Sequence, residues 1–529
     1  MNRSRRAAAW PLALLLLAAS LAGCSGSSSD GRPPSAQSEP MEISVAFWDL
    51  AENMLQDDPA LRLLEQKLNL TIKPIPIKIE NYMQQIQMWA SNGQLPDIFS
   101  VDAVNTQYYR SWRDRGVIKP IPDDLSAYPH LQAYLSLPGT DGLKDDGRLY
   151  FIPRQTYDST DYNVLDRLVV YRWDLAQEAG IAKEPATWNE FRAMLKAIVD
   201  RDPENKHIRG LTANGNLLLG GLFWLYGSPA ATSDGSGSDF KWIKEDGRYI
   251  PAVFSKHSIA SLRLLRDFYA SGLIDPDLPV TRGEMARDKF AEGKVAALIL
   301  AGGAQKLDVS LYREGWLKHH PEDSAFYDKI KLLKPLPSID GNRYHALFKT
   351  FWSESYISAK VDDRKMARIL ELFDYLNTDE FKEMRRFGLE NADYVKEDGR
   401  ITPLGTGASV VTKYKAFSTF ANLLDWDGMY ALNPDYAGIS QGAKEAQREL
   451  VDYSMRTTRK QEYEPKLTQL STPTKDGFTI FDSDDMIRVM ISDLPVEAAW
   501  QTIIDGYKEK GLDRMIEEVN ARAGELGLE

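Results

Sequence analysis

The chain has 529 residues and a formal net charge of −12. A chain of this length is too long for one compact hydrophobic core, so we expect two or more lobes. The acidic balance disfavours a surface for nucleic acid or anionic lipid, so no nucleic-acid partner is expected.

Residues 1–23 have the layout of a secretory signal peptide. Three arginines, at positions 3, 5 and 6, precede an apolar run over residues 7–21. At about 15 residues this run is shorter than the ~20 that a membrane-spanning helix needs. It ends in Leu21-Ala22-Gly23-Cys24, which resembles the lipobox of bacterial lipoproteins. The resemblance implies a lipid on Cys24.

Cys24 is the sole cysteine of the sequence, so no disulfide is possible within one chain. Residues 25–40 are rich in serine, proline and glycine and contain no apolar residue larger than alanine. Such a segment cannot bury enough surface to fold, so we expect residues 24–40 to be a flexible, lipidated tether. The expected location is the outer face of the cell membrane, and such an anchor is typical of a Gram-positive bacterium.

From residue 41 short apolar strands alternate with amphipathic helices. The expected strands are 43–47, 70–79 and 95–100, with helices 61–68 and 82–91 between them. This order is typical of a parallel α/β sheet, whose ligands bind beyond the carboxyl ends of the strands. Trp48, Asp49 and Asp102 follow such ends and are candidate ligand-binding residues.

Further along the chain, helix-start patterns continue the alternation. Thr187 with Glu190, and Thr281 with Glu284, have the spacing of capping boxes. The remaining expected elements are a buried strand over 295–300 and helices over 362–376, 380–387 and 495–510, the last one ending at Gly511.

The common enzyme signatures are absent from the sequence. It has no G-x-S-x-G, H-E-x-x-H, G-x-x-x-x-G-K-[ST] or helix-opening G-x-G-x-x-G motif. The six histidines lack zinc-ligand spacing, and none of the 76 acidic residues stands out as a glycosidase pair. We therefore expect no catalytic residue, no metal and no cofactor. A lipid-anchored carbohydrate-active enzyme, a hydrolase or a lyase, stays open as an alternative.

Several short motifs occur in an order and spacing that are specific when taken together. They are 91–98 (SNGQLPDI), 147–153 (GRLYFIP), 170–175 (VYRWDL), 179–181 (AGI), 271–276 (SGLIDP), 290–294 (FAEGK), 387–390 (FGLE) and 506–512 (GYKEKGL). By these motifs the chain resembles the extracellular solute-binding lipoproteins of carbohydrate ABC importers, in particular their long Gram-positive subgroup. The similarity covers nearly the whole mature chain.

The resemblance implies a periplasmic-binding-protein-like α/β fold with two discontinuous lobes, a ligand cleft between them and closure by a hinge motion. The implied first lobe is 41–168 with 302–352, and the implied second lobe is 169–301 with 353–529. The expected crossovers between the lobes are 167–172, 298–304 and 351–358.

The implied function is capture of a mono- or oligosaccharide, with uronate-containing sugars among the candidates, for the permease subunits of an ABC importer. The implied protein is a monomer. A ligand sensor for a membrane histidine kinase would keep the same fold and is a second alternative. Many relatives have a calcium-binding loop where residues 201–207 (RDPENKH) stand, but this segment lacks the alternating oxygen ligands and the glycine, so we expect no calcium.

A sugar-binding cleft combines aromatic platforms with charged and planar polar groups. By the resemblance, the family's cleft segments map onto Trp48, Asp49, Asp102, Arg154, Trp224 and Tyr226. Three further candidate ligand-binding residues lie at the implied crossovers, namely Arg172, Trp352 and Glu354. Trp426 is a candidate because it is an aromatic residue flanked by two aspartates. Structural alternatives exist for several of these residues. Asp102 would cap the following helix, Arg154 would form a surface ion pair, and Arg172 would pair with Asp174 or Asp166. Trp224 and Tyr226 would belong to a core helix, and Trp426 to a helix-start turn.

Overall fold

The computed structural model describes most of the chain from residue 40 onward, and these residues belong to one compact unit. The described ranges are 40–47, 50, 55–78, 81–137, 140, 143–145, 147–156, 159–214, 219–220, 222–223, 229, 240–303, 305–345, 351–404, 410–424 and 439–528. Six predicted residues lie outside them, namely Cys24, Trp48, Asp49, Trp224, Tyr226 and Trp426.

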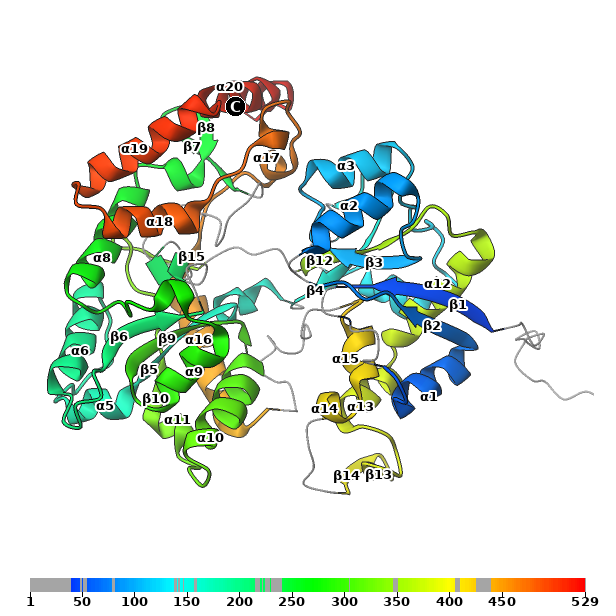
Figure 1. Cartoon of the computed structure of the whole chain (residues 1–529), viewed down its shortest axis with the longest axis horizontal. Coiled ribbons are helices and arrows are strands. Elements are labelled where there is room, and N and C mark those ends of the chain that lie inside the picture. Colours follow the sequence, from blue (N-terminus) through cyan, green and yellow to red (C-terminus); the bar gives the residue numbers. More distant parts are fainter. Residues whose placement is uncertain are drawn as a thin grey trace, which may run out of the picture. The chain divides into compact units, whose positions relative to one another are not determined.

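The first sheet has five strands in the order β2-β1-β3-β12-β4 (Figure 1). The strands are β1 (Met41–Ala46), β2 (Leu70–Pro74), β3 (Ile98–Val101), β4 (Ile152–Gln155) and β12 (Phe351–Ile357). β1 is parallel to β2 and β3, whereas β12 runs antiparallel to β3 and β4. The inner strand β3 and the edge strand β4 are both buried along their whole length, so both faces of each strand are covered.

Helices from two distant parts of the chain pack on this sheet. They are α1 (Pro59–Leu68), α2 (Tyr82–Asn92), α3 (Gln107–Asp114), α4 (Pro129–Tyr134), α12 (Asp363–Leu376), α13 (Asp379–Phe387), α14 (Val410–Lys413) and α15 (Lys415–Ala421), with a hairpin of β13 (Tyr394–Glu397) and β14 (Arg400–Pro403). Asp58 shows how the two parts are joined. Its carboxylate caps α1 through Ala60 N at 2.8 Å and accepts from Ala416 N, in α15, at 2.9 Å. We call the described parts of 40–156 and 351–424 the first lobe, because their apolar side chains share one core.

The second sheet has four strands in the order β10-β5-β9-β6. The strands are β5 (Arg167–Arg172), β6 (Arg209–Ala213), β9 (Val295–Ala301) and β10 (Ile330–Leu332). β6 and β9 are parallel, and β5 is antiparallel to both β9 and β10. Short pairs also form between β7 (Trp242–Glu245) and β8 (Arg248–Pro251), and between β11 (Arg343–His345) and β15 (Thr458–Lys460).

The helices on the second sheet also come from two parts of the chain. They are η3 (Thr160–Leu165), α5 (Trp173–Glu178), α6 (Trp188–Arg201), η5 (Ala252–Phe254), α8 (Ser258–Ala270), η6 (Leu278–Val280), α9 (Gly283–Ala291), the π-helix η7 (Gln305–Trp316), α10 (Leu317–His319), α11 (Phe326–Lys329), α16 (Gln441–Thr457), α17 (Pro465–Gln469), η8 (Lys475–Gly477), α18 (Asp482–Ile491), α19 (Val496–Glu509) and α20 (Leu512–Glu525). We call the described parts of 159–345 and 439–528 the second lobe, since they form their own cores.

These cores place the lobe boundaries differently from the sequence prediction. Residues 307–345 pack in the second lobe, not the first, because β10 joins β5. Residues 353–424 pack in the first lobe, not the second, because β12 lies between β3 and β4. The described residues change lobe across 156–159, 345–351 and 424–439. The predicted crossovers near 167–172 and 298–304 are therefore wrong, and residues 159–168 belong to the second lobe rather than the first.

Some of the predicted helix caps and helix ends are confirmed and others are not. The box at Thr187 is present, with Thr187 Oγ1 accepting from Glu190 N at 3.2 Å. Thr281 does not cap α9, since its hydroxyl donates to Asp277 O and Arg282 occupies the N-cap. The helix predicted over 495–510 is present as α19 and ends before Gly511 as expected, but it is not the last helix, because α20 follows Gly511. Among the described residues no helix is both long and apolar enough to cross a membrane.

Candidate functional site

Strand register brings several predicted residues to one edge of the first sheet. Asp102 directly follows β3, whose last residue, Val101, pairs with Glu354. Because β12 is antiparallel to β3, the preceding residues Ser353 and Trp352 lie at the carboxyl end of β3. Arg154 stands near the carboxyl end of β4, which is parallel to β3. We call Asp102, Arg154, Trp352, Ser353 and Glu354 the first-sheet edge, and this is where an α/β sheet binds ligands.

Arg154 is a fully buried cation at this edge. Its Nη1 donates to Ser353 Oγ at 2.5 Å, and its guanidinium carbon lies 6.0 Å from the centroid of the Trp352 ring. A buried guanidinium fixed by hydrogen bonds costs little side-chain entropy when it meets an anion or a hydroxyl. The alternative of an ordinary surface ion pair does not hold, because the side chain has no exposed area.

Ser353 holds a strained backbone beside Arg154. The pairing of β12 with β4 shifts register between Phe351 and Glu354, and Ser353 within this bulge has a φ of +63°. A non-glycine residue in the left-handed region is uncommon, and bulges often re-aim side chains next to functional sites. The neighbouring Trp352 is 37% exposed, in contrast to the buried Phe351 and Glu354. The bulge therefore presents an aromatic face at the sheet edge.

Glu354 is buried, and its carboxylate accepts hydrogen bonds from backbone N–H groups at the same edge. Its Oε2 accepts from Ala103 N at 2.9 Å, from Val104 N at 3.2 Å and from the Tyr356 hydroxyl at 2.9 Å. Burial, followed by the charge of Glu354, raises the pKa of Tyr356 well above its usual value, so Tyr356 remains a neutral donor. Glu354 thus fixes the turn that carries Asp102.

Asp102 is exposed at the end of β3. It does not cap α3, because Thr106 is the N-cap residue and its hydroxyl oxygen accepts from Tyr108 N at 3.2 Å. Asp102 therefore presents a carboxylate at the first-sheet edge, next to the turn that Glu354 holds.

Arg172 lies in the second sheet and not at the first-sheet edge. It ends β5, beside the start of β10, and its guanidinium binds both carboxylate oxygens of Asp174 at 2.8 and 2.7 Å. The guanidinium carbon also lies 4.9 Å from the Trp316 ring centroid. The carboxyl ends of β6 and β9 lie at the opposite end of β5, where Arg167 pairs with Ala301. This geometry favours the structural alternative for Arg172.

The second sheet has an edge of the same kind that sequence reasoning missed. β6 ends before Asn214, and β9 ends before Gly302 and Gly303, whose φ angles are +58° and +57°. Two consecutive left-handed residues suit glycine and turn the chain into the π-helix η7. π-helical geometry is rare and is frequent at functional sites. The Gly302-Gly303 pair after a buried strand was the available sequence signal.

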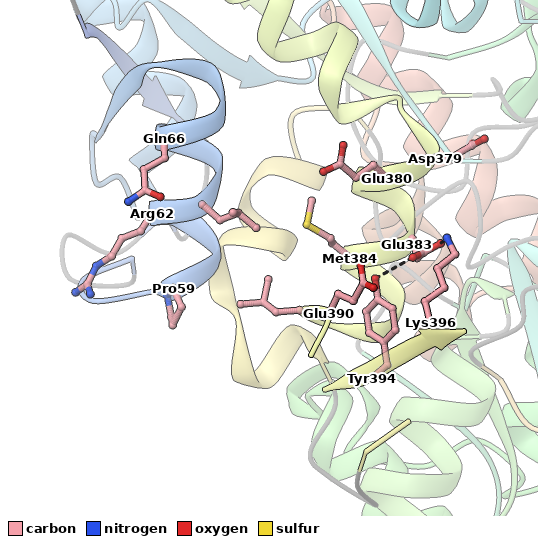
Figure 2. A pocket seen from close by; sticks show the side chains of 12 residues that line it. Pro59, Arg62, Gln66, Asp379, Glu380, Glu383, Met384, Glu390, Tyr394 and Lys396 are labelled. Carbon is pink, nitrogen blue, oxygen red and sulfur yellow. Dashed lines mark hydrogen bonds and ion pairs between the residues drawn. The ribbon is translucent and has the colours of Figure 1, made fainter. Parts of the chain in front are cut away.

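A separate groove lies on the first lobe between α1 and α13 (Figure 2). It measures about 730 Å³, and its lining includes Asp379, Glu380, Glu383 and Glu390. Glu383 accepts from the Tyr394 hydroxyl at 2.8 Å and from Lys396 Nζ at 2.6 Å, and the Lys396 bond lowers the pKa of Glu383. None of the residues of the first-sheet edge lines it.

The chemistry available at the first-sheet edge is that of binding. It exposes one indole and one carboxylate, and the buried Arg154 guanidinium lies beside the indole. An aromatic face next to a polar group suits the apolar face and polar rim of a sugar. Across the described ranges no three His, Cys, Asp or Glu side chains gather in a way that would hold a metal ion.

Comparison with known proteins points the same way. The model of the family "Bacterial extracellular solute-binding protein" matches residues 54–350. Two proteins of Bacillus subtilis (strain 168) are each 22% identical to the chain. Lipoprotein LipO aligns over 74% of this chain and 75% of its own length, and the polygalacturonan/rhamnogalacturonan-binding protein YtcQ over 73% and 74%.

The fold has close counterparts among solved structures. The S. pneumoniae ABC-transporter substrate binding protein FusA, in complex with kestose, superposes with a TM-score of 0.67 at 14% identity. The match covers 93% of this chain and 100% of that one. The architecture is thus the two-lobed α/β fold of periplasmic binding proteins, as predicted.

Proposed function

This chain belongs to the bacterial extracellular solute-binding protein family, and we propose that it captures a carbohydrate outside the cell and delivers it unaltered to an ABC importer. The observation that carries the proposal is the first-sheet edge, where the bulge at Ser353 exposes Trp352 beside the buried Arg154. An aromatic face next to a fixed hydrogen-bond donor is the combination that sugar recognition needs.

We further propose a uronate-containing oligosaccharide as the first candidate ligand. The similarity to YtcQ, described as binding polygalacturonan and rhamnogalacturonan, supports this class. Because FusA is described with kestose, neutral oligosaccharides belong in the same test.

The proposal includes a tether and a partner. Residues 1–23 act as the signal peptide, and a lipid on Cys24 holds the monomeric protein at the outer face of the membrane. The permease subunits of the importer are the protein partner. Similarity to the lipoprotein LipO supports this location. Mass spectrometry of the exported protein tests the anchor, which requires a diacylglycerol-bearing Cys24 at the new N-terminus.

Titration of the purified protein with galacturonate oligomers and with neutral oligosaccharides tests the function. Tryptophan emission reports binding, and an assay for released reducing ends or unsaturated products reports chemistry. We expect saturable binding with sugar recovered intact. Released product would instead favour a hydrolase or lyase. An absence of binding across both sugar classes would remove carbohydrate from the proposal.

A further inference from the structure

An ion pair between residues that do not belong to the first-sheet edge joins the two lobes. Arg110 Nη2, in α3 of the first lobe, donates to Asp476 Oδ1, in η8 of the second lobe. The two side chains are only 16% and 22% exposed. A charge pair that is largely screened from water is worth more than an exposed one, provided that both partners are held in place.

Arg110 is held in place by the first lobe. α3 starts at the Thr106 cap, only a few residues after Asp102, and buries Tyr109 and Trp112 in the first core. The helix therefore moves with the sheet edge that we propose binds the ligand.

Asp476 is held equally firmly by the second lobe. The buried Lys475 donates to Thr468 O at 2.8 Å and to Leu470 O at 2.9 Å. Thr474 binds the Glu518 carboxylate of α20 through its N–H at 2.8 Å and its hydroxyl at 2.7 Å. The second carboxylate oxygen of Asp476 accepts from Ser471 Oγ at 2.6 Å. The backbones that carry the two partners are therefore fixed in different lobes, so a separation of the lobes beyond the reach of the Arg110 side chain breaks the ion pair.

We propose that the Arg110–Asp476 ion pair is an interlobe latch that stabilises the arrangement of the lobes in which ligand is retained. Since both groups are rigid within their own lobes, a hinge motion that separates the lobes must break the pair. The pair therefore shifts the equilibrium between lobe arrangements even without ligand. The effect of the latch on affinity rests on the proposed carbohydrate binding. Its effect on the separation of the lobes does not.

Loss of the latch changes the affinity for the ligand because it changes the populations of the two lobe arrangements. When only one arrangement retains the ligand, the apparent Kd equals the intrinsic Kd divided by the populated fraction of that arrangement. Loss of the latch lowers this fraction, so the apparent affinity falls without loss of any ligand contact. The fall is expected mainly in the dissociation rate, because lobe opening precedes release.

Binding kinetics of the full-length chain test the latch with galacturonate oligomers as the probe. Asp476→Asn and Arg110→Gln are each expected to weaken binding roughly five- to tenfold, mostly through faster dissociation. The double variant should be no weaker than either single variant, and the exchanged pair Arg110→Asp with Asp476→Arg should recover most of the loss. Arg113→Gln is the matched control, since Arg113 lies on the same helix but pairs with Asp114 and Asp145 inside the first lobe.

A distance measurement without ligand separates the latch from the proposed function. Spin labels at Gln84→Cys of α2 and Gln501→Cys of α19 report the separation of the lobes by pulsed electron resonance, with Cys24→Ser as background. Asp476→Asn should shift the distribution towards longer distances, whereas Arg113→Gln should not. An unchanged distribution together with unchanged dissociation would overturn the latch. If the wild type binds none of the sugars while the distribution shifts, the latch stands and the proposed ligand fails.

Discussion

Glu354 acts on the site through the backbone rather than through the ligand. Its carboxylate accepts two N–H groups of the turn after Asp102 and the Tyr356 hydroxyl. Replacing Glu354 by alanine leaves these buried donors unsatisfied, so the free energy of unfolding should fall by about 2–4 kcal/mol. Urea unfolding measures this loss. Tyr356→Phe removes only the hydroxyl bond to Glu354, so it should lower the free energy of unfolding by about 1 kcal/mol. Equal losses for the two variants would contradict the role of Glu354 in holding the backbone of the turn.

Trp352 differs from Glu354 because its side chain is exposed. Trp352→Ala should weaken sugar binding by about 1–3 kcal/mol, the usual effect of losing an aromatic contact with a ligand. The melting temperature should change little, since few core contacts are lost. Calorimetric titration and thermal unfolding together separate the two effects. Unaltered affinity with a lower melting temperature would make Trp352 a structural residue.

The residues of the first-sheet edge differ in how far sequence could predict them. Asp102 and Arg154 were proposed because they follow apolar strands, and strand ends are visible in the sequence pattern; the structure places both at the first-sheet edge. The role of Glu354 was not visible, since its partners are backbone N–H groups that lie about 250 residues earlier. The bulge at Ser353 was equally hidden, because a left-handed φ at serine leaves no mark in composition.

At the scale of elements, the β11–β15 ladder carries a pH-sensitive group. His345 is buried, and its Nδ1 lies 2.7 Å from Thr458 Oγ1. Burial and the charge of Lys460 lower the pKa of His345, while Asp161 opposes them. The unfolded chain, with a histidine pKa of about 6.5, then binds the proton more readily than the folded one. The contribution of His345 to stability is therefore complete above about pH 6.5 and is lost as the pH falls through the lower folded pKa.

Urea midpoints measured between about pH 7.5 and 5 test this titration. The wild type should lose stability towards the acid end, and His345→Gln should lose less over the same interval. Parallel curves for the two proteins would show that His345 does not titrate with folding.

The loop after α6 is held by hydrogen bonds and an ion pair between its own residues. The Asp202 carboxylate accepts from Lys206 N at 2.8 Å, from His207 N at 2.7 Å and from Ile208 N at 3.3 Å. Lys206 Nζ also pairs with Glu204 at 2.8 Å. Because these oxygens are engaged, we expect no calcium binding at this loop, so millimolar calcium and EDTA should give the same melting temperature. A ligand that binds the folded state raises that temperature, so a calcium-dependent rise would contradict this account.

Element prediction failed where tertiary contacts decide. Thr281 and Glu284 have capping-box spacing, yet the Thr281 hydroxyl donates to Asp277 O instead. Gly511 follows the end of α19 as predicted, but its φ of +104° lets the chain turn directly into α20, which was not predicted. Helix existence was predicted well from periodicity, whereas the partner of a hydroxyl group and the continuation after a glycine depend on neighbours distant in sequence.

At the scale of the whole molecule, sequence indicated two lobes but divided them incorrectly. β10 (IKL) and β12 (FWSESYI) both mix apolar and polar residues, and nothing in their composition specifies which sheet each joins. The choice is made by long-range pairing, of β10 with β5 and of β12 with β3 and β4. That choice brings Trp352 and Glu354 beside Asp102, and thus assembles the first-sheet edge from residues about 250 positions apart.

The central claim is that a carbohydrate binds at the first-sheet edge. Hydrogen exchange of the backbone, with and without a saturating galacturonate oligomer, tests it most directly. The ligand should slow exchange in peptides that cover 101–105 and 351–355. It should leave the α1 and α13 peptides of the groove in Figure 2 unaffected. Protection confined to the groove, with none at 101–105 or 351–355, would contradict the account.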